Sequence, residues 1–228
     1  MKKTAVITGA LGNLGRATTQ SFKQHDFQVV GLDRAQSLEQ APQGVEDEEY
    51  HGVDLIDVSA AKALLDKICA DKKPIHAGVM IAGGFGMGSV TETETSEIQK
   101  MIALNFETAY NTMQALWPYM ADGARFIFIG AKPALEPAAG HQMTAYALSK
   151  SLVFRLAEMV NEAGKERGIT ATVIVPSIID TPPNRESMPD ANFDDWVRPE
   201  EIGDMIAYLC SDKGRAVRNS VVKMYANS

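Results

Sequence analysis

Apolar residues follow two different patterns along the chain. Short runs of β-branched and other apolar residues, bounded by glycine, proline or polar residues, are typical of buried strands. Between them lie segments in which apolar residues recur every three or four positions, as in amphipathic helices. We expect strands at residues 4–8, 28–32, 78–82, 125–129 and 170–175, and helices at residues 60–68, 98–120 and 145–163.

This alternation of strands and helices predicts the fold class. Parallel strands need crossover connections, which are usually helical and almost always right-handed. We therefore expect one α/β domain over residues 1–228, a Rossmann-type, doubly wound parallel sheet with helices on both faces. Residues 180–198 are rich in proline and aspartate and show weak periodicity, which predicts a surface excursion that can serve as a substrate lid.

Composition and charge narrow the class of protein. The 228 residues are 45% hydrophobic and 22% charged, as in ordinary globular proteins. The formal net charge of −7 argues against nucleic acid or an anionic membrane surface as a partner. Cys69 and Cys210, the two cysteines, lie far apart and are expected as buried thiols in a reducing compartment. No segment is long enough for a signal-peptide core or a membrane span, so we expect a cytoplasmic protein, and we predict no metal site.

A glycine-rich turn follows the first predicted strand and precedes a helix-like segment. Because glycine has no Cβ atom, the backbone can approach a pyrophosphate, and the amides at the helix start supply donors. This position predicts a dinucleotide-binding turn, with a tight turn that binds no ligand as the alternative. The residues expected to contact the cofactor here are Gly9, Leu11, Gly12, Asn13, Leu14 and Gly15.

An acidic residue ends the second predicted strand. Asp33 follows Gly15 by 18 residues, close to the spacing at which a carboxylate accepts hydrogen bonds from the adenosine ribose. A carboxylate there repels a 2′-phosphate and favours NADH, whereas the neighbouring Arg34 keeps NADPH open as an alternative. Asp54 and Leu55, at the end of a third strand, are expected to border the adenine.

A tyrosine and a lysine share one face of a predicted helix that starts near His141. Tyr146 and Lys150 are four residues apart, so their side chains lie about one helical turn from each other. A cation beside a phenol stabilises the phenolate, which brings the tyrosine toward useful acid and base strength near neutral pH. Taken alone, the pair also fits an ordinary helix surface. Next to a nucleotide-binding turn, it predicts an acid–base group.

Together these features resemble the short-chain dehydrogenase/reductase family. The resemblance covers nearly the whole chain, and it rests on the turn at residues 8–15, Ala82, Gly83, Asn105, Tyr146, Lys150 and residues 176–181. It implies an NAD(P)-dependent oxidoreductase that acts on a small molecule, with Tyr146 as the proton donor. It further implies that Lys150 holds the nicotinamide ribose and lowers the pKa of Tyr146.

The resemblance implies further contacts and an assembly. Asn105 would anchor a water molecule in a proton relay; without the family, it would be interpreted as a residue that kinks or caps its own helix. The helices around Asn105 and Tyr146 would pair across a two-fold axis, which gives a homodimer or homotetramer. Additional cofactor contacts are implied for Ala82, Gly83, Gly84, Pro176, Ile179 and Thr181.

The chain departs from the family pattern at one chemically important place. The family has a serine after the fifth strand, but residues 130–133 are Gly-Ala-Lys-Pro, and no serine occurs from Glu97 through Leu148. The loss matters most for a ketone, whose oxygen gains negative charge during reduction. Thr144 is the nearest hydroxyl before Tyr146 and is an alternative donor. Four other residues also differ from those that are usual in the family: Asn13, Met80, Ile81 and Ser177.

The missing serine is shared with the dihydropteridine reductase branch, which the chain resembles at residues 9–15, 82–84, 130–132 and 180–196. We therefore expect reduction of a quinonoid dihydropterin or a similar conjugated ring, which spreads the incoming electrons over several atoms. The alternatives are a carbonyl or alcohol oxidoreductase that uses Thr144 or a water molecule, and a dinucleotide-binding redox sensor without turnover. A set of large side chains either lines an apolar pocket or fills the core: Met87, Met143, Met188 and Trp196.

Overall fold

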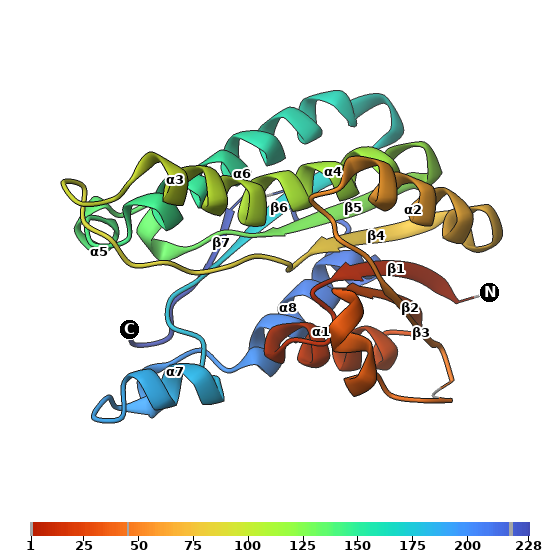
Figure 1. The fold of residues 1–228 in the computed structure, drawn as a ribbon. Helices are drawn as coiled ribbons and strands as arrows, with labels where there is room; N and C mark the ends of the chain where they lie inside the picture. Colours follow the sequence, from red (N-terminus) through yellow and green to blue (C-terminus); the bar gives the residue numbers. More distant parts are fainter. Residues whose placement is uncertain (1, 45, 219–220) are drawn as a thin grey trace.

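The computed structural model describes residues 2–44, 46–218 and 221–228. Within these residues, seven strands form one sheet in the order β3-β2-β1-β4-β5-β6-β7 (Figure 1), and every pair of neighbours is parallel. The strands are β1 Lys3–Thr8, β2 Phe27–Asp33, β3 Glu48–Gly52, β4 Ile75–Met80, β5 Met120–Ile129, β6 Thr170–Pro176 and β7 Val221–Met224. This topology confirms the predicted doubly wound sheet.

Helices cover both faces of the sheet (Figure 1). On one face lie α2 Val58–Lys72, α4 Thr108–Leu116 and α6 Thr144–Ala163, with α3 Thr95–Ile102 packed against α6. On the other face, α1 Asn13–Gln24 packs against α8 Pro199–Cys210. Two short helices, α5 Pro137–Gly140 and α7 Pro182–Ser187, lie beyond the carboxyl ends of the strands. Each face thus has its own apolar core.

The continuous apolar runs in the sequence follow from this covering. Every residue of β6 is buried, as are the residues of β1 after Lys3. A parallel strand that is covered on both faces has no solvent-facing side, so its residues do not alternate between apolar and polar. The strand order reverses between β1 and β4, and in such sheets the ligand crevice lies outside the carboxyl ends at that point.

Two predicted elements have different bounds in the structure. The strand expected at residues 78–82 is β4, which ends at Met80 because the amides of Ile81 and Ala82 donate to the hydroxyl of Thr8 instead. The helix expected over residues 98–120 is divided into α3, a π-helical segment Ala103–Glu107 and α4. Met120 already belongs to β5, after a 3₁₀ turn that contains a proline.

The periodicity missed or misplaced three further elements. The third strand ends at Gly52, before Asp54 and Leu55, although the Val53 amide still donates to the Asp33 carbonyl. β7 and α8 are not among the predicted elements, because β7 is a short edge strand and α8 follows directly on the irregular residues 180–198. None of the helices in the described ranges is long and apolar enough to cross a membrane.

Candidate active site

The glycine-rich turn between β1 and α1 has no room for a side chain at Gly9 or Gly15. Gly9 has a φ of +64°, and a Cβ there would lie 3.0 Å from the amide nitrogen of Ala82. A Cβ on Gly15 would lie 2.0 Å from the carbonyl oxygen of Gly9, so the first turn of α1 packs directly on the loop. Gly12 is the N-cap of α1 and, in the part of the chain that is described, no side chain caps that turn. The amides of Asn13 and its neighbours therefore remain available to an anion.

Asp33 ends β2 beside this turn, as predicted. Its Oδ2 accepts a hydrogen bond from the Leu11 amide at 2.9 Å, and its Oδ1 accepts one from the Arg34 amide at 2.8 Å. The Arg34 side chain is exposed next to it. The carboxylate is thus held between the turn and the end of β2, where both of its oxygens can still accept further hydrogen bonds.

Asp54 and Leu55 lie in the loop after β3 rather than at the end of a strand. The Asp54 carboxylate accepts a hydrogen bond from the Ile56 amide at 3.0 Å, and Asp54 is exposed. Leu55 is buried, and its carbonyl accepts a hydrogen bond from the Asn111 side chain at 2.9 Å. This contact ties the loop to α4.

Asn105 connects three parts of the site from within the π-helical segment. Its Oδ1 accepts a hydrogen bond from the Gly84 amide at 2.9 Å, and its Nδ2 donates to Ser149 Oγ at 3.0 Å. A π-turn changes the direction of the side chains that follow it, and such turns are frequent at functional sites. The interpretation as a residue that only kinks or caps its own helix is therefore wrong, since both strong hydrogen bonds reach other segments.

Lys150 is buried at the carboxyl end of β5. Its ammonium donates to the carbonyl oxygen of Ile129 at 2.8 Å, and only 6% of the residue is exposed. A Cβ on Gly83 would lie 2.4 Å from Asn105 Oδ1 and 3.5 Å from Lys150 Nζ, so glycine is required for this loop to approach both side chains. Burial lowers the pKa of Lys150 to about 8.

Tyr146 lies one turn before Lys150 on α6, and the ring of Phe85 packs edge-on against its ring at 5.1 Å. Burial raises the pKa of Tyr146 to about 12. The direction of this shift is opposite to the one expected from Lys150: desolvation of the phenol raises its pKa, and the ammonium is bound to the Ile129 carbonyl. The phenol is protonated at neutral pH and can donate its proton.

Ala131, two residues after the end of β5, is among the residues that stand where the family has a serine. Ala131 is buried, and the amide of the preceding Gly130 still donates to the Ile174 carbonyl, so the strand end has the regular geometry. Thr144 begins α6, and its amide donates to the Gly88 carbonyl. Its hydroxyl oxygen is enclosed and has no hydrogen-bond partner among the described residues.

The segment that follows β6 carries the remaining predicted contacts. Pro176 is the last residue of β6, Ile179 forms a bridge with Val197, and Thr181 is the N-cap of α7. The bridge joins the two ends of residues 180–198, which we call the lid segment. Trp196, considered above as a pocket residue, is 5% exposed and packs on the ring of Phe193.

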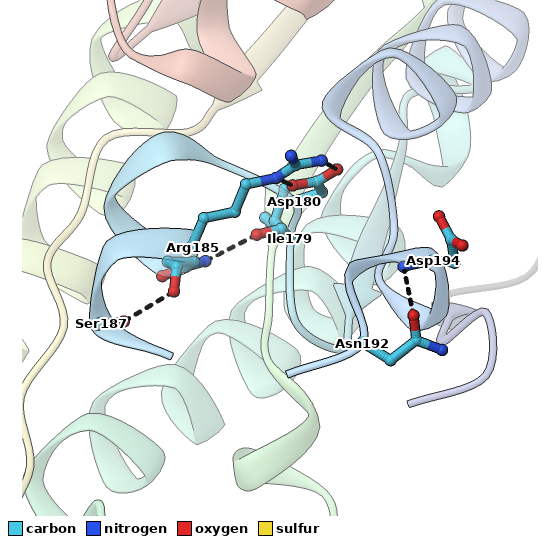
Figure 2. A network of polar contacts seen from close by, with 7 residues as sticks. Ile179, Asp180, Arg185, Ser187, Asn192 and Asp194 are labelled. Carbon is cyan, nitrogen blue, oxygen red and sulfur yellow. Dashed lines mark hydrogen bonds and ion pairs between the residues drawn. The ribbon is translucent and has the colours of Figure 1, made fainter. Parts of the chain in front are cut away.

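Figure 2 shows how the lid segment is held together. The guanidinium of Arg185 forms two hydrogen bonds with the Asp180 carboxylate, at 2.5 and 2.7 Å. It also stacks 4.6 Å from the centre of the Phe193 ring. Asn184 donates to the Ile179 carbonyl at 2.8 Å. An open cavity of about 430 Å³ separates this segment from the start of α1. It is lined by Asn13, Asp180, Pro182, Arg185, Arg198, Pro199 and Glu200.

Sequence reasoning missed three residues that the structure brings into this arrangement. Ser149 stands between Tyr146 and Lys150 in the sequence, but only the fold shows its contact with Asn105. Phe85 follows the predicted Gly83-Gly84 pair, but its contact with Tyr146 joins segments that are distant in the chain. Arg185 lies in the predicted lid, but its pairing with Asp180 depends on the turn of α7.

The residues at this edge of the sheet fit a dinucleotide. The turn leaves no room for side chains, its helix start presents free amides, and a carboxylate stands at the end of β2. Gly83 and Lys150 approach each other on the far side of the β1–β4 reversal, where a nicotinamide half would lie. Within the described ranges, no group of three or more His, Cys, Asp or Glu residues is placed to hold a metal ion.

Comparisons with known proteins agree with this site. Residues 3–192 match the family described as short chain dehydrogenase. The chain is 26% identical to dihydropteridine reductase of Dictyostelium discoideum over 100% of this chain and 96% of that protein. It is 23% identical to the 3-oxoacyl-(acyl-carrier-protein) reductase of Thermotoga maritima, over 96% and 95% of the two chains.

The solved structures show the same fold. A blue fluorescent protein from a metagenomic library, in complex with NADPH, superimposes with a TM-score of 0.89 at 23% sequence identity, over 99% of this chain and 97% of that one. The family match includes the nucleotide-binding turn and the Tyr146–Lys150 pair. The chain therefore belongs to the short chain dehydrogenase family and is an NAD(P)-dependent oxidoreductase.

Proposed function

We propose that the protein is an NADH-dependent reductase of a quinonoid dihydropterin or a similar conjugated ring, with Tyr146 as the proton donor. The observation that carries this proposal is the composition of the catalytic edge, by which we mean Asn105, Tyr146, Ser149 and Lys150. It offers a protonated phenol, and the serine position at the end of β5 is the buried Ala131. The similarity to the Dictyostelium dihydropteridine reductase supports the same substrate class.

One donor is sufficient only for certain acceptors. During the reduction of a ketone, negative charge develops on one oxygen, which two hydrogen-bond donors stabilise better than one. A quinonoid ring distributes that charge over several nitrogens and a carbonyl, so a single proton transfer completes the step. The serine-free site therefore favours a conjugated ring over a simple ketone.

The residues of the catalytic edge divide the chemistry between them. Bound NADH supplies a hydride ion to the substrate. Tyr146 transfers its proton to a ring nitrogen or oxygen of the substrate, and the phenolate regains a proton from solvent, so that one hydride and one proton are added in total. Lys150, held at the Ile129 carbonyl, contributes its donors to the nicotinamide ribose. Because Gly83 has no side chain, its loop can lie close to Asn105 and Lys150.

The loop after β4 supplies an apolar surface for a planar substrate. Phe85, Met87 and Val90 are all more than 60% exposed, and the Phe85 ring touches that of Tyr146. Exposed large apolar side chains that gather beside a catalytic group are typical of a binding site for an aromatic ligand. The lid segment, held by Arg185 and Asp180, would close over this ligand from the opposite side.

The cofactor preference rests on Asp33. Its carboxylate stands beside the turn, where it accepts hydrogen bonds from ribose hydroxyls and repels a 2′-phosphate. Arg34 is exposed next to it and is the residue through which NADPH would be accommodated. We therefore propose NADH as the preferred cofactor, with NADPH as the weaker one.

We also propose a homodimer through α4 and α6. These helices leave large apolar side chains exposed, among which Leu148, Leu152 and Met159 follow one another along α6. A self-complementary apolar face of this kind is suited to a two-fold interface.

Cys69 and Cys210 are buried as free thiols, which supports a location in the reducing cytoplasm.

The enclosed Thr144 hydroxyl favours one second candidate, a carbonyl reductase in which Thr144 moves to donate to the substrate oxygen. An assay of NADH oxidation separates the candidates, with quinonoid dihydropterin tested beside a panel of ketones and aldehydes. We expect turnover of the dihydropterin and little turnover of the ketones. Ketone turnover that depends on Thr144 would establish the second candidate, and tight NADH binding without any turnover would make the redox sensor the leading hypothesis.

A further inference from the structure

Ser149 forms the link between two hydrogen bonds that connect distant parts of the chain. Its hydroxyl accepts from Asn105 Nδ2 at 3.0 Å and donates to the Tyr146 carbonyl at 2.8 Å. Asn105 in turn accepts from the Gly84 amide at 2.9 Å. A continuous chain of three hydrogen bonds therefore runs from the loop after β4, through the π-helical segment, to the helical turn that carries Tyr146.

The two side chains in the middle of this series of hydrogen bonds are shielded from water. Ser149 is 0% exposed and Asn105 is 2% exposed. A buried amide or hydroxyl that loses its partner pays the full cost of desolvation, so each bond restricts the groups on either side of it. The single hydrogen of the hydroxyl points at the Tyr146 carbonyl, which leaves its lone pairs for Asn105. The rotation of the hydroxyl is thereby fixed.

A second serine on the same helix shows what an ordinary local contact looks like. Ser151 Oγ donates to the Leu148 carbonyl at 2.6 Å, the same contact to the residue three positions earlier that Ser149 makes. The Ser151 contact is exposed, and its partner is a residue of its own helix. Ser149 differs because it also receives a hydrogen bond from a residue 44 positions away.

Resting on the proposed role of Tyr146, we propose that Ser149 is a positioning residue that transmits the position of the Gly83–Gly84 loop, through Asn105, to the turn that carries the Tyr146 phenol. Gly83 and Lys150 approach each other at the same loop. The link therefore fixes the position of the Tyr146 phenol relative to the groups that face the nicotinamide half. The phenol oxygen is at the end of a long side chain, and a small rotation of its turn displaces it strongly.

Substitution of Ser149 tests this link, with Ser151→Ala as the matched control. We expect Ser149→Ala to lower kcat about 10- to 100-fold, because a displacement of the donor by a fraction of an ångström costs rate at the chemical step. The Kd for NADH should stay within about twofold, since the Ser149 hydroxyl is already bonded to Asn105 and to the Tyr146 carbonyl. Ser151→Ala should leave both quantities at the wild-type level. Ser149→Cys, which keeps a weak donor, should recover part of kcat.

A second readout does not depend on turnover. In cofactor-free protein, unfolding by denaturant should show Asn105→Ala and Ser149→Ala to be non-additive, whereas Asn105→Ala and Ser151→Ala should be additive. If wild type turns over dihydropterin and Tyr146→Phe does not, but Ser149→Ala keeps kcat within about twofold, the positioning role is wrong and the proposed function stands. If wild type reduces no acceptor, the proposed function fails. The link between Asn105 and Ser149 is tested independently, and it would be overturned if the effects of Asn105→Ala and Ser149→Ala on the free energy of unfolding were additive. Should Ser149→Ala fail to fold, a wild-type kcat in Ser149→Cys with its poorer donor would overturn the proposal.

Discussion

The catalytic edge and the lid segment are held by opposite kinds of interaction. At the catalytic edge, Asn105, Ser149 and Lys150 are nearly inaccessible to solvent, and each makes a hydrogen bond to a different segment of the chain. In the lid segment, Arg185 exposes 51% of its side chain while it binds Asp180 and stacks on Phe193. Buried hydrogen bonds are costly to break, whereas exposed ion pairs contribute little net stability.

This difference corresponds to two tasks. Proton transfer requires a donor held to within tenths of an ångström, which a buried and fully bonded network provides. A segment that admits substrate must open on the timescale of turnover, and a small net stability allows it to do so. We therefore expect changes at the catalytic edge to act on kcat, and changes in the lid segment to act on KM.

The largest effect is expected from Tyr146→Phe. It removes the transferable proton and keeps the ring that packs against Phe85. Turnover should fall about 10²- to 10⁴-fold, the usual contribution of a general acid. NADH binding, followed by fluorescence titration, should change little. Tyr208→Phe, on the exposed side of α8, is the matched control and should behave as wild type. A kcat in Tyr146→Phe close to that of wild type would remove the phenol from the mechanism.

Lys150→Met should have the next largest effect on turnover. Loss of one charge-assisted hydrogen bond predicts a decrease of about 10- to 100-fold in kcat/KM. This substitution also has a signature in stability. Burial lowers the pKa of Lys150 from its ordinary value of 10.5 to about 8, so between these pH values the unfolded chain binds more protons than the folded one.

The lowered pKa of Lys150 fixes the direction in which the free energy of unfolding depends on pH. Relative to Lys150→Met, the free energy of unfolding of the wild type should rise with pH from about 8 to 10.5, with a slope of at most about 1.4 kcal/mol per pH unit. Below this range the lysine is charged in both states and the full cost of its burial is present. Denaturant titrations of both proteins across the range measure the difference, and a flat difference would mean that the ammonium is solvated in the folded protein.

A change in cofactor preference is expected from Asp33→Asn. The asparagine oxygen can still accept from the Leu11 amide, but the negative charge that repels a 2′-phosphate is gone. The ratio of kcat/KM for NADH over that for NADPH should fall at least about tenfold, the scale of one like-charge contact. Asp71→Asn, on the exposed surface of α2, is the matched control and should leave the ratio unchanged. An unchanged ratio in Asp33→Asn would show that this carboxylate does not face the ribose.

The smallest effect is expected in the lid segment. Arg185→Gln breaks the pair with Asp180 and the stacking on Phe193. KM for the substrate should rise about two- to fivefold, in proportion to the small net strength of an exposed ion pair, while kcat stays nearly constant. Arg155→Gln removes a similar exposed pair, with Glu158 on α6, and should change neither quantity. A large loss of kcat in Arg185→Gln would place the lid segment in the chemistry itself.

Much of the fold was predictable because the buried parallel strands and the amphipathic helices leave direct periodic signals. For the two elements whose predicted bounds were wrong, a tertiary contact decided the outcome. β4 stops at Met80 because the Thr8 hydroxyl takes the next two amides, and the long helix is interrupted where Asn105 reaches across to α6. Neither event changes the apolar pattern of the segment in which it occurs.

The candidate site was predictable only in part for a similar reason. The spacing of the glycine turn and Asp33 predicts nucleotide binding, and the spacing of Tyr146 and Lys150 predicts an acid–base group. The pKa of Tyr146 depends instead on how deeply the fold encloses it, and burial reverses the shift that the Tyr146–Lys150 spacing indicates. The contacts of Ser149 and Phe85 arise between segments that are distant in the chain, so no local pattern records them.

The central claim is that one proton donor serves a conjugated substrate and that the absent serine selects against ketones. The most direct measurement compares kcat/KM of wild type and Ala131→Ser for quinonoid dihydropterin and for a simple ketone. Ala131 is buried two residues after the end of β5, and serine differs from it by one hydroxyl group. We predict a gain of at least about tenfold for the ketone, the scale of one oxyanion donor, and no gain for the dihydropterin. A wild type that already reduces the ketone as well as the dihydropterin would contradict the claim, as would an Ala131→Ser variant in which both substrates gain equally.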